Sequence, residues 1–396
     1  MNPGFASLEP YPFQRLTALL QGVQPAEQPR IALTIGEPQH APPDHVVSAL
    51  AGALTGVARY PATIGSEPLR TAIAEWLQGR FDLEFVDPER QVLPVNGTRE
   101  ALFAIAQALV TPGEPCRVIS PNPFYQIYEG AALLAGTTPR FVPAQAETGF
   151  VPQYHLLSED DWQQAEVLYL CNPGNPSGAV MSLEALQNLI QTARAHNVIV
   201  ISDECYSEIY RDEESPPPGL LTAAASLGYT DFSGCLVFHS LSKRSNLPGL
   251  RSGFVAGDAD LISQFTRYRT YHGCAMPPHH QVASTVAWRD EEHARNNRRL
   301  YREKFAAVMP LLRPHLELPE PDAGFYLWPA VPGDDAVFAR RLIERCNVAV
   351  LPGQYLGREI NGCNPGAGRI RMALVAELDH CTTAAERMAM ALKEGL

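Results

Sequence analysis

Residues 240–253 read SLSKRSNLPGLRSG, and the interpretation of the fold begins with this stretch. Lys243 stands among small hydroxyl residues, and Arg251 follows eight positions later in a loop that contains Pro and Gly. Short apolar runs precede and follow the stretch, so we expect it to connect two buried strands. Lys243 is therefore either an ordinary solvated lysine or a reactive amine that holds a cofactor covalently.

The composition and charge narrow the kind of protein and the partners that it can have. The chain has 396 residues, 45% of them hydrophobic and 19% charged, which is typical of a globular protein with one large and one smaller domain. The net charge of −12 argues against nucleic acid or an anionic membrane as a partner. No apolar run approaches the roughly 20 residues that span a bilayer, and the N-terminus lacks a signal-peptide pattern, so we expect a cytoplasmic protein.

The cysteines do not form a recognisable metal or disulfide pattern. Eight cysteines are scattered along the chain without a CxxC pair, and several lie in apolar runs. Small buried thiols fit this distribution better than a disulfide framework or a zinc site. We therefore expect no bound metal.

Strands alternate with helices through most of the chain. The apolar run 198–201 (VIVI) is typical of a strand that is buried on both faces, which favours a parallel sheet between two layers of helices. Ser182 is placed to cap a helix over residues 182–196. The strands that we expect in this sheet are 92–95, 117–120, 140–143, 167–170, 198–202, 236–239 and 254–256.

The pattern changes in the last third of the chain, which indicates a second domain. A long helical and basic stretch is expected from Gln281 through Arg313, followed by shorter strands and helices. We predict an α/β protein with a three-layer, mostly parallel large domain over residues 44–280. A smaller α+β domain then comprises residues 281–396, and the N-terminal segment 1–43 packs with it.

Polar side chains follow three of the expected strands. Asn175 comes after 167–170, Asp203 after 198–202 and Lys243 after 236–239. The carboxyl ends of parallel strands meet at one edge of a sheet, where ligands bind, so these side chains are expected to lie close together. Residues 96–98 (NGT) precede a helix over 99–110, and its N-terminus is a natural anion site.

These residue types match what pyridoxal phosphate (PLP) requires of a protein. Lys243 supplies the amine that binds the aldehyde, and Asp203 a carboxylate for the pyridine nitrogen. Tyr206 and Asn175 supply donors for the ring oxygen, and Tyr125 an aromatic ring that stacks on the pyridine. Each of these residues taken alone is an ordinary turn or core residue. The candidates for the phosphate are Gly97, Thr98, Ser240, Ser242 and Arg251.

The ordered set of motifs resembles the fold-type I, class I/II aminotransferases across nearly the whole chain. The motifs are NGT (96–98), PNPFY (121–125), NPGNPSG (172–178), DECY (203–206), SLSKRSNLPGLR (240–251) and GRIR (368–371).

The resemblance implies a PLP enzyme that acts on amino acids and oxo acids as a homodimer with shared active sites. It gives Lys243 the covalent and catalytic role and adds Arg99 to the phosphate site. Tyr60 is expected to reach the phosphate of the partner subunit, and Arg369 to bind the substrate α-carboxylate near the Gly36 backbone.

Four segments are similar to the narrower group of bacterial N-succinyldiaminopimelate aminotransferases of lysine biosynthesis. They are LEPYPFQRL (8–16), IGEPQHAPP (35–43), SKRSNLPGLRSGFVAGD (242–258) and YHGCAMPP (271–278). The expected reaction moves an amino group between glutamate and N-succinyl-2-amino-6-oxoheptanedioate, which gives 2-oxoglutarate and N-succinyl-LL-2,6-diaminopimelate. Candidate cations for the distal carboxylates are Arg15, Arg267, Arg269, His272 and Arg371.

Other functions on the same fold stay open at this point. An aspartate, alanine or aromatic aminotransferase and a PLP carbon–sulfur β-lyase would use the same cofactor residues. A PLP-sensing regulator would need a basic DNA-binding extension, which this acidic chain does not carry before residue 31.

Overall fold

The computed structural model describes residues 2–396, and its largest element is a seven-stranded sheet. The strand order is β2-β8-β7-β6-β5-β3-β4, in which β8 runs antiparallel to both neighbours and the other pairs are parallel. The mostly parallel sheet expected from the sequence is therefore confirmed. The strands are β2 (Val92–Val95), β3 (Val118–Asn122), β4 (Pro139–Pro143), β5 (Val167–Cys171), β6 (Ile199–Asp203), β7 (Cys235–Ser240) and β8 (Gly253–Gly257).

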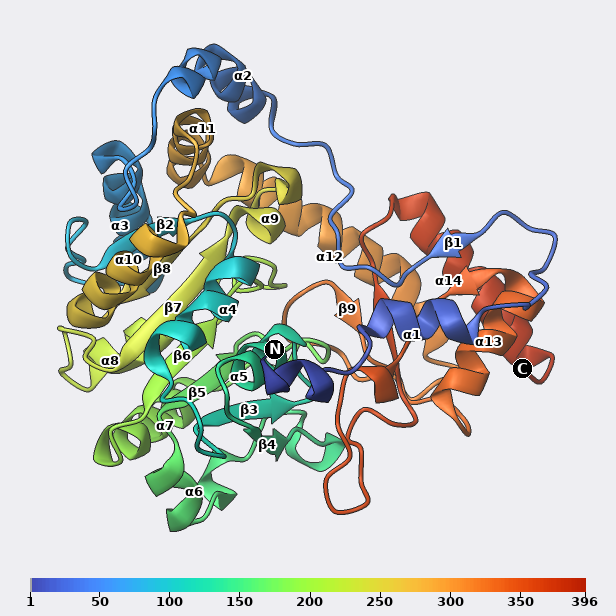
Figure 1. The fold of residues 1–396 in the computed structure, drawn as a ribbon. Coiled ribbons are helices and arrows are strands. Elements are labelled where there is room, and N and C mark those ends of the chain that lie inside the picture. Colours follow the sequence, from blue (N-terminus) through green and yellow to red (C-terminus); the bar gives the residue numbers. More distant parts are fainter. Residues whose placement is uncertain (1) are drawn as a thin grey trace.

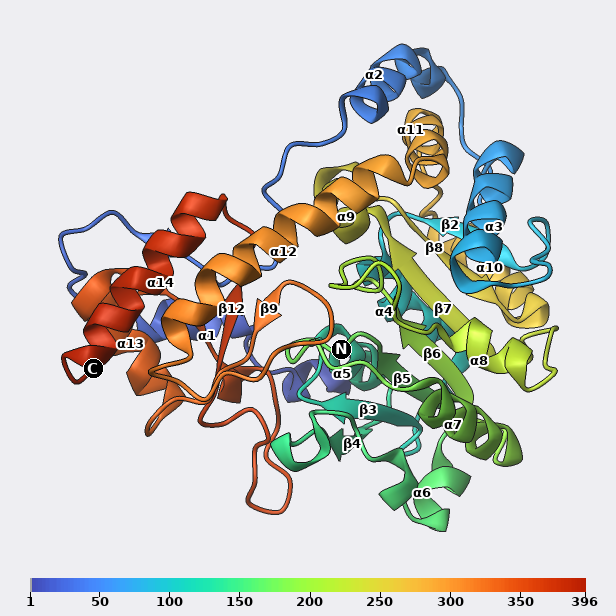
Figure 2. The same cartoon turned by 180° about the vertical axis from the view of Figure 1, so that it is seen from behind.

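Helices cover both faces of this sheet because its strands are apolar on both sides (Figures 1 and 2). In β5, Leu168 and Leu170 pack in one hydrophobic cluster, whereas Val167 and Tyr169 pack in another on the opposite face. The first face carries α3 (Glu67–Phe81), α6 (Glu159–Gln164), α7 (Leu183–Ala195) and α8 (Leu220–Ser226). The second face carries α4 (Thr98–Leu109), α5 (Ile127–Leu134) and α10 (Ala259–His272).

The C-terminal part forms a smaller α+β unit with its own core. A three-stranded antiparallel sheet has the order β11-β12-β9, and β10 pairs in parallel with β1 of the N-terminal segment. Ile31 and Leu33 of that segment are buried in the same core. The elements are β1 (Ile31–Ala32), β9 (Tyr326–Leu327), β10 (Val348–Ala349), β11 (Leu351–Pro352), β12 (Ile370–Ala373), α13 (Asp335–Cys346) and α14 (Leu378–Lys393).

A long helix, α12 (Glu292–Leu312), joins the two parts. It extends from the region of α9 (Leu241–Arg244) and α11 (Pro278–Arg289) to the C-terminal helices α13 and α14 (Figures 1 and 2). The remaining helices are η1 (Pro3–Ser7), α1 (Pro12–Leu19), α2 (Asp44–Gly52), η2 (Leu54–Ala58), η3 (Ala146–Thr148), η4 (Tyr154–Leu156), η5 (Pro248–Leu250) and η6 (Gly353–Tyr355). No helix within residues 2–396 is both long and apolar enough to cross a membrane.

The predicted domain limits need two corrections. The single helix expected from Gln281 through Arg313 is two helices, and Trp288 of α11 packs in the core of the large sheet. The large unit therefore continues to the end of α11, beyond the predicted limit at residue 280. The N-terminal segment is also divided, because η1 packs on α5 and Asn2 Nδ2 donates to Leu134 O (2.9 Å).

Candidate active site

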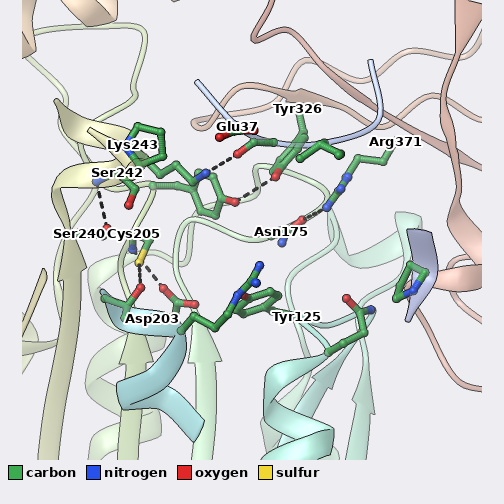
Figure 3. A pocket seen from close by; sticks show the side chains of 18 of the residues that line it. Glu37, Tyr125, Asn175, Asp203, Cys205, Ser240, Ser242, Lys243, Tyr326 and Arg371 are labelled. Atoms are coloured by element: carbon green, nitrogen blue, oxygen red, sulfur yellow. Dashed lines mark hydrogen bonds between the residues drawn. The ribbon is translucent and has the colours of Figure 1, made fainter. Parts of the chain in front are cut away.

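A cavity of about 540 Å³ lies at the carboxyl ends of the parallel strands, between the two parts of the molecule. Cys171, Asp203 and Ser240 end the neighbouring strands β5, β6 and β7. Figure 3 shows side chains from the large sheet, the N-terminal segment and the small sheet around this space. The predicted residues that line it are Gly36, Thr98, Arg99, Tyr125, Asn175, Asp203, Tyr206, Ser240, Ser242, Lys243, Arg251 and the candidate cation Arg371.

Lys243 lies on the short helix α9, directly after β7. The Ser240 hydroxyl caps this helix by accepting a hydrogen bond from Ser242 N (3.0 Å), which holds the turn that presents the lysine. The Lys243 amine donates to the backbone oxygen of Gly36. Burial lowers the pKa of Lys243 to about 8, so the amine exchanges protons readily near neutral pH.

Asp203 is a buried carboxylate at the end of β6. Its Oδ2 accepts from Tyr128 Oη (2.7 Å), and its Oδ1 accepts from Cys205 N (3.2 Å). Burial raises the pKa of Asp203 despite these bonds. A carboxylate in this environment gains most from a cationic partner, because a positive charge offsets its lost hydration.

The anion site expected at residues 97–98 is built around Arg251. Gly97 precedes α4 with φ +84°, and a Cβ added there would lie 2.2 Å from Arg251 Nη2. Only glycine therefore lets the guanidinium approach the N-terminus of α4, where free N–H groups favour an anion. Ser240, Ser242 and Thr98 line the same cavity.

Tyr125 and Arg99 form a pair on the cavity wall. Arg99 Nε donates to Tyr125 Oη (2.6 Å), and burial raises the pKa of Tyr125. The bond holds the Arg99 guanidinium at the tyrosine, whereas the three atoms nearest to a Cβ added at Gly97 all belong to Arg251. The predicted role of Arg99 at the phosphate therefore receives less support than that of Arg251.

Tyr206 and Asn175 lie on the side of the cavity that faces the small sheet. The hydroxyls of Tyr206 and Tyr326 are 3.0 Å apart, and Asn175 Oδ1 accepts from Arg371 Nη1 (3.1 Å; Figure 3). These contacts bring strands β9 and β12 to the loops that follow β5 and β6.

The prediction for Arg369 needs correction. Arg369 does not line the cavity; it donates to Trp328 O (3.0 Å) and pairs with Glu317 (3.2 Å). Arg371, two residues later, lines the cavity and donates to Asn175 and to Thr34 O (3.0 Å). Arg369 precedes β12 (Ile370–Ala373), whereas Arg371 lies within it, so the GRIR motif alone did not show which arginine reaches the cavity.

Other predicted cations and loops lie elsewhere. Arg269 is buried and pairs with Glu100, and Arg15 stacks on the ring of Tyr355. Arg244, in the segment 242–258 that resembles the narrower group, is buried and bonds to Glu291 and to Asp290 O (3.0 Å). Of residues 244–250, only Pro248 lines the cavity, so the other residues of this loop do not contact it directly.

Several cavity residues were missed by sequence reasoning. Cys205 lies in the DECY motif and its thiol is 3.1 Å from Thr98 Oγ1, but the motif offered no sign that it faces the cavity. Glu37 and Tyr326 reach the cavity only through tertiary packing. The same holds for the start of α1, which contributes Tyr11, Pro12 and Phe13.

The geometry agrees with comparisons to known proteins. The family model for class I and II aminotransferases matches residues 28–387. The chain belongs to this family. It is similar to the LL-diaminopimelate aminotransferase of Aquifex aeolicus (strain VF5), with 32% identity over 387 residues and 96% of each chain covered.

Solved structures of aminotransferases share the fold of this family member. One is an aminotransferase from Neisseria meningitidis Z2491, with 45% identity, a TM-score of 0.94, and 99% of this chain and 100% of that chain covered. Another is a probable N-succinyldiaminopimelate aminotransferase from Thermus thermophilus, with 28% identity, a TM-score of 0.84 and coverage of 96% and 100%.

The aminotransferase is PLP-dependent, and its cavity fits the cofactor. Lys243 offers a buried amine of lowered pKa, Asp203 a buried carboxyl group of raised pKa, and Arg251 a guanidinium against Gly97. When bound, PLP supplies an aldehyde that takes up an amino group and a ring that accepts electrons from the substrate α-carbon. The protein groups needed at each end of that molecule line one cavity.

Proposed function

We propose that this aminotransferase moves an amino group between glutamate and N-succinyl-2-amino-6-oxoheptanedioate, in lysine biosynthesis. The observation that carries the proposal is that two guanidinium groups besides Arg251, those of Arg371 and Arg99, line the same cavity as Lys243. A substrate with a carboxylate at each end needs a cation at each end, and a guanidinium binds a carboxylate through two parallel hydrogen bonds.

Arg371 is the residue that we assign to the α-carboxylate. It takes the role that the sequence resemblance suggested for Arg369. It is buried, its Nε makes no hydrogen bond with residues 2–396, and it is bonded to Asn175 on the cavity wall. A carboxylate held there brings the α-carbon toward Lys243, whose amine takes the α-proton and returns it during the transfer. The lowered pKa of Lys243 suits both roles.

Arg99 is then available for the distal carboxylate. Its guanidinium is held through Nε by Tyr125, close to the side of the cavity formed by Tyr11 and Phe13 of the N-terminal segment. The apolar surface of Phe13 and Leu356 beside it suits the methylene arm of a pimelate.

LL-Diaminopimelate itself is a second candidate substrate. Relatives that share 30–32% identity with this chain are named LL-diaminopimelate aminotransferases. The exposed carboxylate of Glu37, which lines the cavity, would favour the distal ammonium group of that compound. The succinylated compound carries a neutral amide at that position.

One experiment separates these substrates. The enzyme is first converted to its amino form with glutamate, and the recovery of the original absorbance is then measured with each acceptor. We expect recovery with N-succinyl-2-amino-6-oxoheptanedioate to be faster than with tetrahydrodipicolinate, oxaloacetate or pyruvate. Faster recovery with tetrahydrodipicolinate would select LL-diaminopimelate, and release of pyruvate and ammonia from cystathionine would select a β-lyase.

We also propose that the enzyme is a homodimer whose subunits share active sites. Tyr60 is fully exposed in the single chain and lies near other exposed apolar side chains of η2 and α11, Leu54, Val57 and Val282. These two elements contact each other, so the side chains belong to one region of the surface. Burial of this region against a second copy removes apolar surface from water and lets Tyr60 reach the partner's cavity.

A further inference from the structure

A chain of three buried polar residues lies behind the cavity and outside the roles assigned above. Lys304, His40 and Asn297 are 2%, 9% and 1% exposed. The Lys304 amine is 2.6 Å from His40 Nε2, and His40 Nδ1 is 2.9 Å from Asn297 Oδ1. Buried polar groups are costly unless they are paired, so these three side chains stabilise the fold only as a hydrogen-bonded set.

The hydrogen bonds among these three residues all donate in the same direction, from Lys304 to His40 to Asn297. Asn297 Nδ2 lies 3.0 Å from Lys243 O and 3.1 Å from Arg244 O, and only the NH₂ group can donate to both oxygens. Asn297 Oδ1 must then accept, so His40 carries its proton on Nδ1 and accepts at Nε2 from Lys304. Burial lowers the pKa of His40, which keeps the ring in this neutral form.

The Lys304–His40–Asn297 hydrogen bonds connect separate parts of the molecule to the backbone of Lys243. Lys304 and Asn297 lie seven positions apart on α12, and Lys304 also donates to Val375 O (3.2 Å), just after β12. His40 belongs to the N-terminal segment, four residues after Gly36, whose backbone oxygen accepts from the Lys243 amine. Lys243 is thus held at its carbonyl by Asn297 and at its amine by Gly36.

We propose that Asn297 and His40 are positioning residues that hold the Lys243 turn through a directed Lys304–His40–Asn297 hydrogen-bond chain. This inference rests on the proposed catalytic role of Lys243. A donor at residue 297 fixes the carbonyl from which the lysine side chain departs. A small displacement of a group that transfers a proton lowers kcat strongly, whereas the carboxylate contacts that set KM are left in place.

The sharpest variant is Asn297→Asp, which keeps the side-chain shape and replaces the donor by an oxygen. We expect kcat for the glutamate half-reaction to fall about tenfold while KM changes by less than about twofold. One carboxylate oxygen still accepts from His40 Nδ1, whereas the other faces the oxygens of Lys243 and Arg244, so the thermal midpoint is measured beside kcat to separate a local displacement from a loss of folding. A kcat within about twofold of that enzyme would overturn the proposal.

A pair of variants at His40 tests the direction of the chain. His40→Asn keeps an N–H that donates to residue 297, whereas His40→Leu removes it. We expect His40→Asn to retain most of kcat and His40→Leu to match Asn297→Asp. Equal loss in the two His40 variants would contradict the directed chain and leave only a general packing role.

Tyr301→Phe is the matched control. Tyr301 lies on the same helix, its ring centroid is 4.8 Å from that of His40, and its hydroxyl has no hydrogen-bond partner within residues 2–396. Its removal is expected to change neither kcat nor KM. Hydrogen exchange of residues 240–247 in the cofactor-free enzyme gives a second readout: it should rise in Asn297→Asp and His40→Leu, and unchanged exchange in both would overturn the proposal.

Lys243→Ala in the same half-reaction tests the catalytic role of Lys243 separately from the positioning role of Asn297 and His40. Loss of turnover in that variant supports the role of Lys243 on which the positioning chain depends. Retained turnover would overturn that role together with the inference, whereas the choice of oxo acid would still be decided by the separate acceptor experiment.

Discussion

Arg371 and Arg369 provide a matched pair of substitutions. Arg371→Ala is expected to lower kcat/KM for glutamate about 100-fold, because a charge-assisted carboxylate contact is lost. Arg369→Ala is expected to stay near the unchanged enzyme, because its partners are Trp328 O and Glu317 on the outside of the cavity. Steady-state kinetics with several donors measure both; a larger loss in Arg369→Ala would reverse the assignment.

Lys243 also links the site to stability. Burial lowers its pKa from the ordinary value of 10.5 to about 8, so the folded state releases a proton that the unfolded state keeps between those two pH values. The protonated amine therefore destabilises the folded protein fully below pH 8, and this cost disappears as the pH rises toward 10.5.

Replacement of Lys243 by Met should show this cost directly. In the cofactor-free protein we expect Lys243→Met to unfold at higher urea concentration than the unchanged protein at about pH 7. The difference should shrink between about pH 8 and pH 10, and urea titrations at both ends of this range measure it. A difference that is equal at both pH values would be inconsistent with a buried amine of lowered pKa.

Residues that follow strands were the most predictable part of the site. Asp203 ends β6, and Asn175 and Lys243 lie in the segments that follow β5 and β7, so parallel strands bring all three to one edge. Arg371 and Tyr326 were less accessible to sequence reasoning because they reach the cavity from a separate sheet. Their approach depends on how the small unit packs against the large one, which no local pattern records.

At the level of elements, helix caps are a testable local signal. Ser182 caps α7 as expected, since its side chain accepts from Ala185 N (3.1 Å). We expect Ser182→Ala to lower the free energy of unfolding by about 1 kcal/mol without a change in kinetics, and Ser182→Thr to recover most of it. Urea denaturation measures the first effect; a change in KM would indicate an unforeseen link between α7 and the cavity.

Some elements departed from the expected boundaries for physical reasons. Pro43 occupies the N-cap position of α2, and the carboxylate of Asp44 lies in its first turn, where it favours the positive end of the helix dipole. The break between α11 and α12 falls where Arg244 bonds to Asp290 O and Glu291, so a tertiary contact ends one helix and starts the next. α10 was not named in advance, although Asp258 caps it with bonds to the N–H groups of residues 260 and 261.

At the level of the whole molecule, shared sites predict complementation between inactive subunits. Lys243→Ala and Tyr60→Ala each damage both sites of their own homodimer. A mixed dimer contains one site with Lys243 and Tyr60 both intact, so an equal mixture that exchanges subunits should regain about a quarter of the wild-type activity. Activity assays and light scattering measure this; no recovery in a mixture shown to contain mixed dimers would contradict a shared site.

The linear sequence by itself determined the α/β class, the mostly parallel sheet and the gathering of Asn175, Asp203 and Lys243 at one edge of it. These features follow from short-range causes: strand and helix periodicity, caps, and the common edge at which parallel strands end. Only the tertiary structure decided that Arg371 rather than Arg369 lines the cavity, that Arg244 is buried, and that Asn297 donates to the backbone oxygen of Lys243. Those outcomes depend on the packing of distant segments, since a side chain reaches its partner only after the small unit and the N-terminal segment have closed over the large sheet.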